Sequence, residues 1–315
     1  MTNETPGDTG FVDDAHRAFN TLGKHMLLGR LGVLLEATQE IAYSFVSETH
    51  GGIPSPSSPM ATDCSSSSEQ LVGEVGRVCG VWHVVAAECL QAVASVHSDG
   101  RLLFAPGPLL RAVIEQCSRI GWVLDGPDAR GRAARAWLAQ VVANGEDAHT
   151  HRNAGTPTPT LAGAPARLEE LCEVTLPALF DGEKPDRSAS RPSAWTFLGQ
   201  KWGPHTDAVV RFFENHVRPR WGTGIDGRVE YRVASMFTHP STTAVFAQAI
   251  QQEPGSATFE WDWSLTRTRS LVALASFEAA TASLYAYLGW STPAMAAWTE
   301  QLGRFIRDTA EAKSD

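Results

Sequence analysis

The residues with the clearest potential for chemistry are Arg232, Ser235 and His239, within the stretch Tyr231 to Thr243. Their spacing of i, i+3 and i+7 places them on one face of a helix. Pro240 disfavours helical geometry at His239, so this helix should end at about that residue. An imidazole at a helix C-terminus lies near partial negative charge, which favours its protonated form. The stretch therefore combines a guanidinium, a hydroxyl and a tunable imidazole.

A second set consists of polar residues that stand alone in apolar helical patterns. It comprises His83, Glu88, Glu115, Arg119, Arg232, His239 and Glu278. A buried carboxylate is costly unless it is paired or neutralised, so these groups must find partners if their helices pack together. Two interpretations are open. They form an internal salt-bridge network, such as Glu115–Arg119 with Glu278–Arg232, or they line a pocket in which Glu or His acts as acid or base.

The favoured hypothesis is an enzyme that acts on a small, largely apolar organic substrate by acid–base chemistry in a pocket between helices. Ten tryptophans could help to line such a pocket, although core packing explains most of them. No cofactor and no metal are expected. The catalytic candidates are His239, Glu115 and Glu278, and the substrate-binding candidates are Arg232, Arg119, Trp122, Ser235 and Asp125.

A pair of metal-ligand types, Glu146 and His149, has the ExxH spacing of helical di-iron proteins. A complete site needs a second set of ligands, and the chain has no second ExxH. Asn144-Gly145 also predicts a helix stop just before this pair. A surface turn with accidental ligand types is the better interpretation, and a di-iron oxidase is a minor alternative.

Composition narrows the class of protein. The chain has 315 residues and a formal net charge of -9, which argues against a general nucleic-acid surface. Its five cysteines form no CxxC pair, so we expect reduced thiols in a cytoplasmic protein. The apolar run Ser270 to Trp290 contains Glu278 and predicts a buried core helix rather than a membrane span. The expected partner is a small-molecule ligand, and a homodimer is left open.

Hydrophobic periodicity without sustained alternation predicts a single all-α domain over residues 1–315, a multi-helix bundle with long loops. Gly51 to Ser68 should be a flexible loop, and Gly155 to Pro165 a linker within the domain. Arg218 to Gly224 should be another loop. The predicted helices are Phe11–Glu48, Glu69–Val96, Pro108–Leu124, Asp128–Ala143, Ala166–Phe180, His205–His216, the one ending near His239, Ala244–Gln252, Leu265–Leu288 and Pro293–Ala310.

Three stretches resemble a group of uncharacterised actinobacterial helical proteins that is distantly HEPN-like. They are Leu109 to Asp125 with the arginines that follow, Arg191 to Ala194, and Tyr231 to His239. The resemblance covers roughly residues 108–252 and implies an α-helical bundle. It also implies that one set of residues is linked, namely Glu115, Arg119, Trp122, Asp125, Arg232 and His239.

The same resemblance suggests a second function. In HEPN ribonucleases an Arg-x6-His pair lies in a cleft, where histidine transfers protons and arginine steadies the phosphate. Arg232 and His239 have this separation, but Val233 stands where that family usually has a polar residue. A metal-independent ribonuclease or an inactive relative is therefore an alternative. A non-catalytic ligand-binding or interaction module is another, and it predicts that buried charges pair only with each other and leave no ligand-sized cavity.

Overall fold

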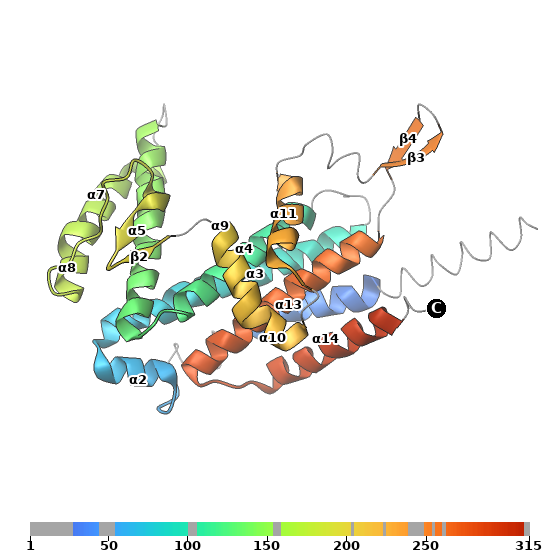
Figure 1. Ribbon diagram of the computed structural model, residues 1–315, viewed down its shortest axis with the longest axis horizontal. Helices are drawn as coiled ribbons and strands as arrows, with labels where there is room; N and C mark the ends of the chain where they lie inside the picture. The colour runs from blue at the N-terminus through green and yellow to red at the C-terminus, as the bar shows by residue number, and fades with distance from the viewer. Residues whose placement is uncertain are drawn as a thin grey trace, which may run out of the picture.

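The computed structural model describes residues 28–43, 54–99, 106–153, 159–202, 205–222, 225–238, 249–253, 256–259 and 263–311. Over these residues the fold is all-α, as predicted: helices make up most of the chain, and the strands form two short antiparallel hairpins. In Figure 1, α3, α4 and α13 lie in the middle of the bundle, and α5 leads away to a lobe that contains α7, α8 and β2.

The elements have the following bounds. The long helices are α3 (Glu69–Asp99), α4 (Pro106–Leu124), α5 (Ala129–Asn153), α13 (Trp263–Leu288) and α14 (Pro293–Glu311), with a further helix over residues 28–43. The shorter ones are α2 (Pro59–Ser66), α6 (Pro159–Ala162), α7 (Ala164–Glu170), α8 (Leu176–Leu179), α9 (His205–Phe212), α10 (Arg218–Trp221) and α11 (Gly227–Thr238). Turns of π-helix, η1 (Leu171–Thr175) and η3 (Phe213–Val217), follow α7 and α9, and η2 (Pro192–Ala194) is a 3₁₀ turn.

The two hairpins are small. β1 (Thr196–Phe197) pairs with β2 (Gln200–Lys201), and β3 (Ala249–Glu253) pairs with β4 (Ser256–Phe259). Leu198 and Gly199 both have positive φ, which is the backbone of a tight two-residue hairpin turn. This turn directs the chain back towards the bundle at Trp202.

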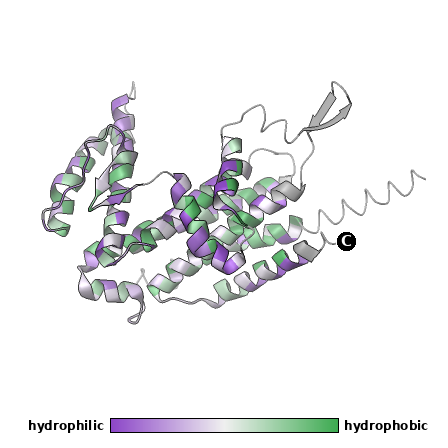
Figure 2. Cartoon of the chain, in the orientation of Figure 1, coloured by the Kyte–Doolittle hydropathy of each residue, from purple (hydrophilic) through white to green (hydrophobic). Residues whose placement is uncertain are grey.

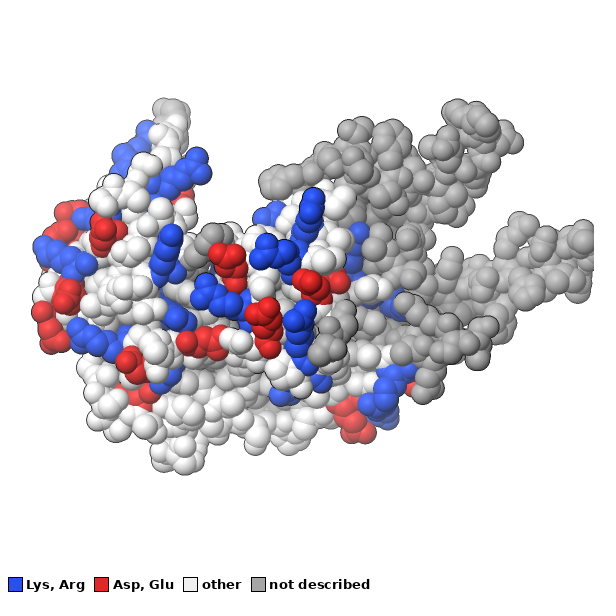
Figure 3. Space-filling view, viewed as in Figure 1, with Lys and Arg blue, Asp and Glu red and all other residues white. Residues whose placement is uncertain are grey.

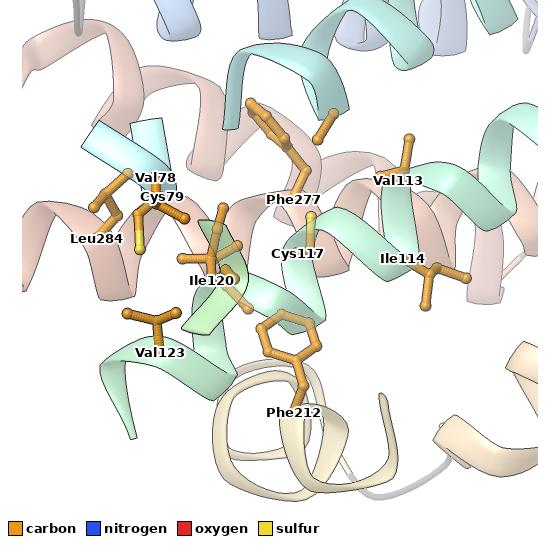
Figure 4. Close-up of a cluster of buried hydrophobic side chains, with 14 of the residues drawn as sticks. Val78, Cys79, Val113, Ile114, Cys117, Ile120, Val123, Phe212, Phe277 and Leu284 are labelled. Carbon is orange, nitrogen blue, oxygen red and sulfur yellow. The ribbon is translucent and has the colours of Figure 1, made fainter. Parts of the chain in front are cut away.

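Helix α4 is the central element, because it packs against α3, α13, α11, α9 and α5. Its apolar side chains meet those of α3, α9 and α13 in one buried cluster (Figure 4). The labelled members are Val78, Cys79, Val113, Ile114, Cys117, Ile120, Val123, Phe212, Phe277 and Leu284. In contrast, hydrophilic residues gather on α9, α10 and α11, which cross the front of the bundle (Figure 2). Of these three helices, α9 and α11 pack directly on α4.

Helix α13 confirms the prediction of a buried core helix, since residues 272–281 are all buried. Two helical stretches, Glu69–His97 and Arg267–Leu288, are long and apolar enough to cross a bilayer, but core helices of folded proteins have the same character. Inside the core, the ring of His83 stacks on Phe277, and its Nε2 lies 2.8 Å from the hydroxyl of Thr281. That hydroxyl donates to the carbonyl of Phe277, so His83 Nε2–H is the donor to Thr281.

Polar side chains cap several helix starts. The Asp128 carboxylate accepts from the backbone N–H of Gly131 at 2.7 Å, and the Thr292 hydroxyl accepts from that of Met295 at 3.1 Å. Ser58 caps α2 in the same way through the N–H of Ala61. This last cap was not foreseen: the predicted loop of residues 51–68 is wrong over α2, whose Asp63 is buried and binds Arg132 of α5.

The predicted stop at Asn144-Gly145 is also wrong, because α5 continues to Asn153. A Cβ on Gly145 would lie 2.5 Å from the ring of Trp195 and 2.8 Å from Pro192. The missing side chain of Gly145 thus allows the η2–β1 segment to pack closely on α5. This packing offsets the cost of a glycine inside a helix.

Three further boundaries differ from the prediction. The expected linker of residues 155–165 contains α6 and the start of α7, although residues 155–158 lie outside the described part. The expected loop of residues 218–224 begins with α10. The predicted helix of residues 244–252 is contradicted at its end by β3, and residues 244–248 lie outside the described part.

Candidate functional site

The strongest concentration of polar and aromatic groups lies where α9 packs along α4. Glu115, Arg119 and Trp122 follow one another at i, i+4 and i+7 on one face of α4. The two helices run in the same direction, because His205 at the start of α9 lies near Glu115, and His216 beyond its end binds Asp125. Figure 3 shows charged side chains over α9, α10 and α11 and over the α5–α8 lobe, with a largely uncharged surface at α2.

Glu115 is held by α11 and by its own helix. Its Oε1 accepts a hydrogen bond from the Tyr231 hydroxyl at 2.7 Å and another from Arg111 Nε at 2.9 Å. Burial would raise the pKa of Glu115, but the hydrogen bond from Tyr231 and the nearby His205 and Arg111 outweigh it and hold the pKa below its ordinary value. A carboxylate kept ionised in this way is a weak base. Its geometry suits anchoring α11 on α4 better than the proton transfer that we expected of it.

Arg119, unlike Glu115, has no oppositely charged partner among the described residues. Its guanidinium lies over the rings of Trp202 and Trp82, with 5.4 and 6.0 Å from Cζ to the ring centroids. Its Nη1 donates to the Gln116 side chain at 3.3 Å, and its buried Nε has no hydrogen-bond partner in the described part of the chain. Burial lowers the pKa of Arg119, since Glu115 is committed to Arg111 and Tyr231. The predicted Glu115–Arg119 salt bridge is not formed.

A groove surrounds the outer side of Arg119, and we call it the α4–α9 groove. It is lined by Arg119, Trp122, Trp202, His205, Ala208 and Arg211. Its enclosed space is about 20 Å³, enough for roughly one water molecule. A chemical group the size of a carboxylate or one phosphate oxygen would fill it, and the rest of a ligand would lie on the surface.

The α5 helix and the β1–β2 hairpin are joined to the groove through Trp122. Arg135 donates from Nη1 to the backbone carbonyl of Trp122 at 2.5 Å and from Nε to Gln200 at 2.7 Å. The ring of Trp202 meets that of Trp122 edge to face, with 5.2 Å between centroids. His205 meets the other side of Trp202, and burial together with Arg119 lowers the pKa of His205. Its imidazole is therefore neutral at neutral pH.

At the far end of α4, Asp125 joins three elements. Its Oδ1 lies 3.0 Å from His216 Nε2, and its Oδ2 accepts from the Asn215 side chain at 3.0 Å. His216 Nδ1 lies 2.9 Å from the Ser283 hydroxyl of α13. Burial opposes ionisation of Asp125, but His216 and Asn215 outweigh it and lower its pKa. Ser283, His216 and Asp125 are thus linked in the order of a catalytic triad. However, the Ser283 hydroxyl donates to the carbonyl of Ala279 within α13. These bonds therefore join helices and do not activate a nucleophile.

Glu278 lies outside the α4–α9 groove. Its fully buried carboxylate accepts from Arg220 at both oxygens, with Nε to Oε2 at 2.7 Å, and from the indole N–H of Trp221 at 3.0 Å. The predicted Glu278–Arg232 pair is therefore wrong, because α10 and not α11 supplies the cation. Both oxygens of Glu278 are occupied by protein donors, so this carboxylate joins α13 to α10.

Of the stretch Tyr231 to Thr243, which carries Arg232, Ser235 and His239, the structure describes residues 231–238. Arg232 is exposed, and the partners of Glu115 are Arg111 and Tyr231 instead. Ser235 donates its hydroxyl hydrogen to the carbonyl of Tyr231 at 2.7 Å. Helix α11 ends at Thr238, close to the predicted end, and His239 lies outside the described residues. The structure thus brings Glu115, Arg119 and Trp122 together near the groove, with Asp125 at its far end, and leaves Arg232 and Ser235 apart from them.

The Glu146/His149 pair is helical after all, on the exposed surface of α5. No group of three or more His, Cys, Asp or Glu side chains suited to a metal ion occurs among the described residues. All five cysteines are free thiols. The predicted surface location of the pair is confirmed, while its predicted turn is wrong.

No protein-family model matches the chain, and neither do curated proteins or solved structures. The HEPN-like resemblance therefore stays a prediction that rests on the residues quoted for it.

Sequence reasoning missed several residues of this region. His205, Arg211 and Gln200 lie in the groove or against it, and Arg220 and His216 hold the surrounding helices. Trp202 was noted only as one of many aromatics. A usable signal was present at Trp202-Gly-Pro-His205, where an indole precedes a helix start that carries an imidazole.

Proposed function

We propose that this protein binds a small organic anion in the α4–α9 groove, with Arg119 as the main contact to its acidic group. The observation that supports this most strongly is the state of the Arg119 guanidinium. It lies over two indole rings, and among the described residues it forms no salt bridge with a carboxylate and its Nε has no hydrogen-bond partner. A desolvated guanidinium is favourable when an anion completes its hydrogen bonds.

The charges around the groove favour the same ligand class. Arg211 lines the groove together with Arg119, and Arg135 binds the backbone carbonyl of Trp122. Glu115 and Asp125, in contrast, already bind other groups. A locally positive groove on a chain with net charge -9 would concentrate anions at this place. The apolar part of the ligand would rest on Trp122 and Ala208, at the mouth of the groove.

A matched pair of probes tests the proposal. 1-Anilinonaphthalene-8-sulfonate is anionic, and N-phenyl-1-naphthylamine has the same aromatic system without the charge. We expect the folded protein to bind the sulfonate at least tenfold more tightly. Arg119→Met should remove this preference, while Arg152→Met, at an exposed cation near the end of α5, should keep it. Equal binding of the two probes, or an unchanged preference in Arg119→Met, would refute the proposal.

An acid–base enzyme is the second candidate, and one observation favours it. His205 is neutral, borders the groove and lies next to Arg119, so it can accept a proton from a ligand whose acidic group Arg119 holds. Our original proton-transfer candidates were Glu115, Glu278 and His239. In this proposal His205 takes the role of Glu115, and His239 can still contribute from the end of α11.

Catalysis is tested by incubating the protein with a metabolite extract and following consumption by mass spectrometry. A compound that the wild type consumes and His205→Gln does not would support an enzyme. If no compound changes, or if both proteins act equally, the His205 proposal fails while anion binding stands. A parallel incubation with RNA in EDTA tests the HEPN-like alternative, which requires cleavage that disappears in His239→Ala.

A further inference from the structure

The free edge of the Arg119 guanidinium indicates which acidic group the α4–α9 groove suits. Its Nη1 is bonded to Gln116, whereas its Nε has no partner among the described residues. Nε–H and Nη2–H lie on one edge of a guanidinium and point in parallel, so together they match the two oxygens of a carboxylate. Three other arginines, Arg77, Arg132 and Arg220, each bind a carboxylate of this protein through Nε and Nη2. Arg119 has the same edge free for a carboxylate from a ligand.

The size of the enclosed space beside Arg119 also favours a carboxylate. The space measures about 20 Å³, which is room for roughly one water molecule. A carboxylate is flat and meets the guanidinium edge with both oxygens in one plane. A sulfonate or phosphate can reach the same donors only with its third oxygen outside this space, so a carboxylate is the better fit.

A second cation, Arg211, lines the same groove from α9. Its side chain is exposed, and it forms no ion pair in the described part of the chain, although Asp207 stands one turn earlier at the i, i+4 spacing. Burial lowers the pKa of Arg135, Asp125 opposes this effect, and the nearby charge of Arg211 adds to it. Arg211 therefore lies close enough to Arg135 for their positive charges to oppose each other, and an anion beside Arg211 relieves that repulsion.

The two cations of the lining are spaced along the groove. Arg119 lies close to His205, since burial and then the charge of Arg119 lower the pKa of that imidazole. Arg211 stands six positions beyond His205 on α9, which is about 9 Å along a helix axis. Ala208 is halfway between these two positions, and its small side chain leaves room above the helix for an apolar group.

We infer that the ligand of the α4–α9 groove is a dicarboxylate with an apolar spacer, one carboxylate bound side-on by Arg119 and the other by Arg211. This inference rests on the proposed function and adds the number and type of acidic groups. The spacer lies along Ala208 and Trp122, the apolar part of the lining. No acidic side chain is among the described residues that line the groove, so neither carboxylate meets a like charge there.

The test is isothermal titration calorimetry of the full chain with three probes that share one biphenyl body. Biphenyl-4-carboxylate has one acidic group, biphenyl-4,4′-dicarboxylate has one at each end, and biphenyl-2,2′-dicarboxylate has two close together. The 4,4′ compound should bind about fivefold more tightly than the monoacid, the gain that a favourable exposed ion pair gives. The 2,2′ isomer carries the same charge but should not show this gain, because its two carboxylates cannot reach both arginines.

Variants at Arg211 separate the second contact from the first. Arg211→Gln should bind the 4,4′ compound no more tightly than the monoacid, and Arg211→Lys, which keeps the charge, should retain most of the gain. Arg152→Gln, at an exposed cation near the end of α5, is the matched control and should retain all of it. Circular dichroism checks that each variant is folded, as the exposed position of Arg211 leads us to expect.

Three results would overturn the inference: equal affinity of the wild type for the monoacid and the 4,4′ compound, an equal gain for the 2,2′ isomer, or a full gain in Arg211→Gln. Each of them leaves the anion site at Arg119 intact, because the sulfonate and its uncharged analogue test that site separately. If Arg119→Met binds the monoacid as tightly as the wild type does, the proposed function fails and the inference fails with it.

Discussion

Arg220 binds both carboxylate oxygens of Glu278 across 58 positions of sequence, and the carboxylate has no exposure to solvent. The pair fastens α10 to the middle of α13, and Trp221 and Thr299 add further hydrogen bonds. The Arg220 side chain is 43% exposed, so only one partner of the pair is fully desolvated.

Removing one partner of this pair should therefore cost more than removing both. We expect Arg220→Met to lower the free energy of unfolding by about 3–5 kcal/mol, because it leaves a buried carboxylate without a counter-charge. The double variant Arg220→Met/Glu278→Leu should recover most of that loss. Urea unfolding measures both values. A double variant as unstable as the single one would show that the pair contributes by its own attraction.

The hydrogen bond from Tyr231 to Glu115 should make the protein less stable as the pH falls into the acid range. The pKa of Glu115 is held below its ordinary value of 4.5, so its contribution is complete above pH 4.5 and is lost as pH falls through the lower, folded-state pKa. Tyr231→Phe removes a hydrogen bond to the ionised form and should weaken this dependence, at a cost of about 1–2 kcal/mol at pH 7. Thermal unfolding between pH 3 and 7 would show it, with Tyr43→Phe, on an exposed tyrosine, as the control.

His83 should add a dependence of its own. Burial lowers its pKa from 6.5 to about 3, so between these values the unfolded chain binds a proton that the folded chain does not. Stability should then fall as pH decreases below 6.5, by up to about 1.4 kcal/mol per pH unit. His83→Leu should reduce this slope, whereas His149→Leu, at an exposed position of α5, should leave it unchanged. An unchanged slope in His83→Leu would rule out His83 as its source.

Gly121 should be intolerant of any side chain. A Cβ there would lie 2.6 Å from the Phe212 ring and 3.3 Å from His216, so α9 and α4 could not pack as closely. We expect Gly121→Ala to destabilise the fold by about 1–3 kcal/mol. Gly73→Ala is the matched control, because nothing lies within 4 Å of its Cβ, and it should stabilise α3 by up to about 1 kcal/mol. Equal effects of the two changes would contradict the close contact between α4 and α9.

His205 should make anion binding stronger in acid. Its pKa lies below the ordinary value of 6.5, so the ring is neutral at pH 7 and gains positive charge as pH falls through that lower pKa. Affinity for 1-anilinonaphthalene-8-sulfonate should rise over this range, and the rise should be absent in His205→Gln. The measurement is a fluorescence titration at each pH where circular dichroism shows the variant and the wild type folded.

Much of the fold followed from local patterns. The apolar spacing of α3, α4 and α13 and the caps at Asp128 and Thr292 act over a few residues, so their positions could be predicted closely. The misplaced boundaries share a cause: Asn144-Gly145 has the composition of a helix stop, but contact with Trp195 makes the glycine a packing residue of α5. Composition cannot distinguish a glycine that ends a helix from one that admits a distant ring.

For the candidate site too, the sequence predicted the local features and the tertiary structure decided the contacts. The sequence by itself determined that α4 carries Glu115, Arg119 and Trp122 on one face and that Glu278 is an isolated charge in an apolar helix, because helical periodicity requires no knowledge of neighbours. Only the tertiary structure decided the partners: Tyr231 and Arg111 for Glu115, Arg220 for Glu278, and indole rings for Arg119. Those choices depend on which helices pack together, and packing is set by the shape of apolar faces over the whole bundle.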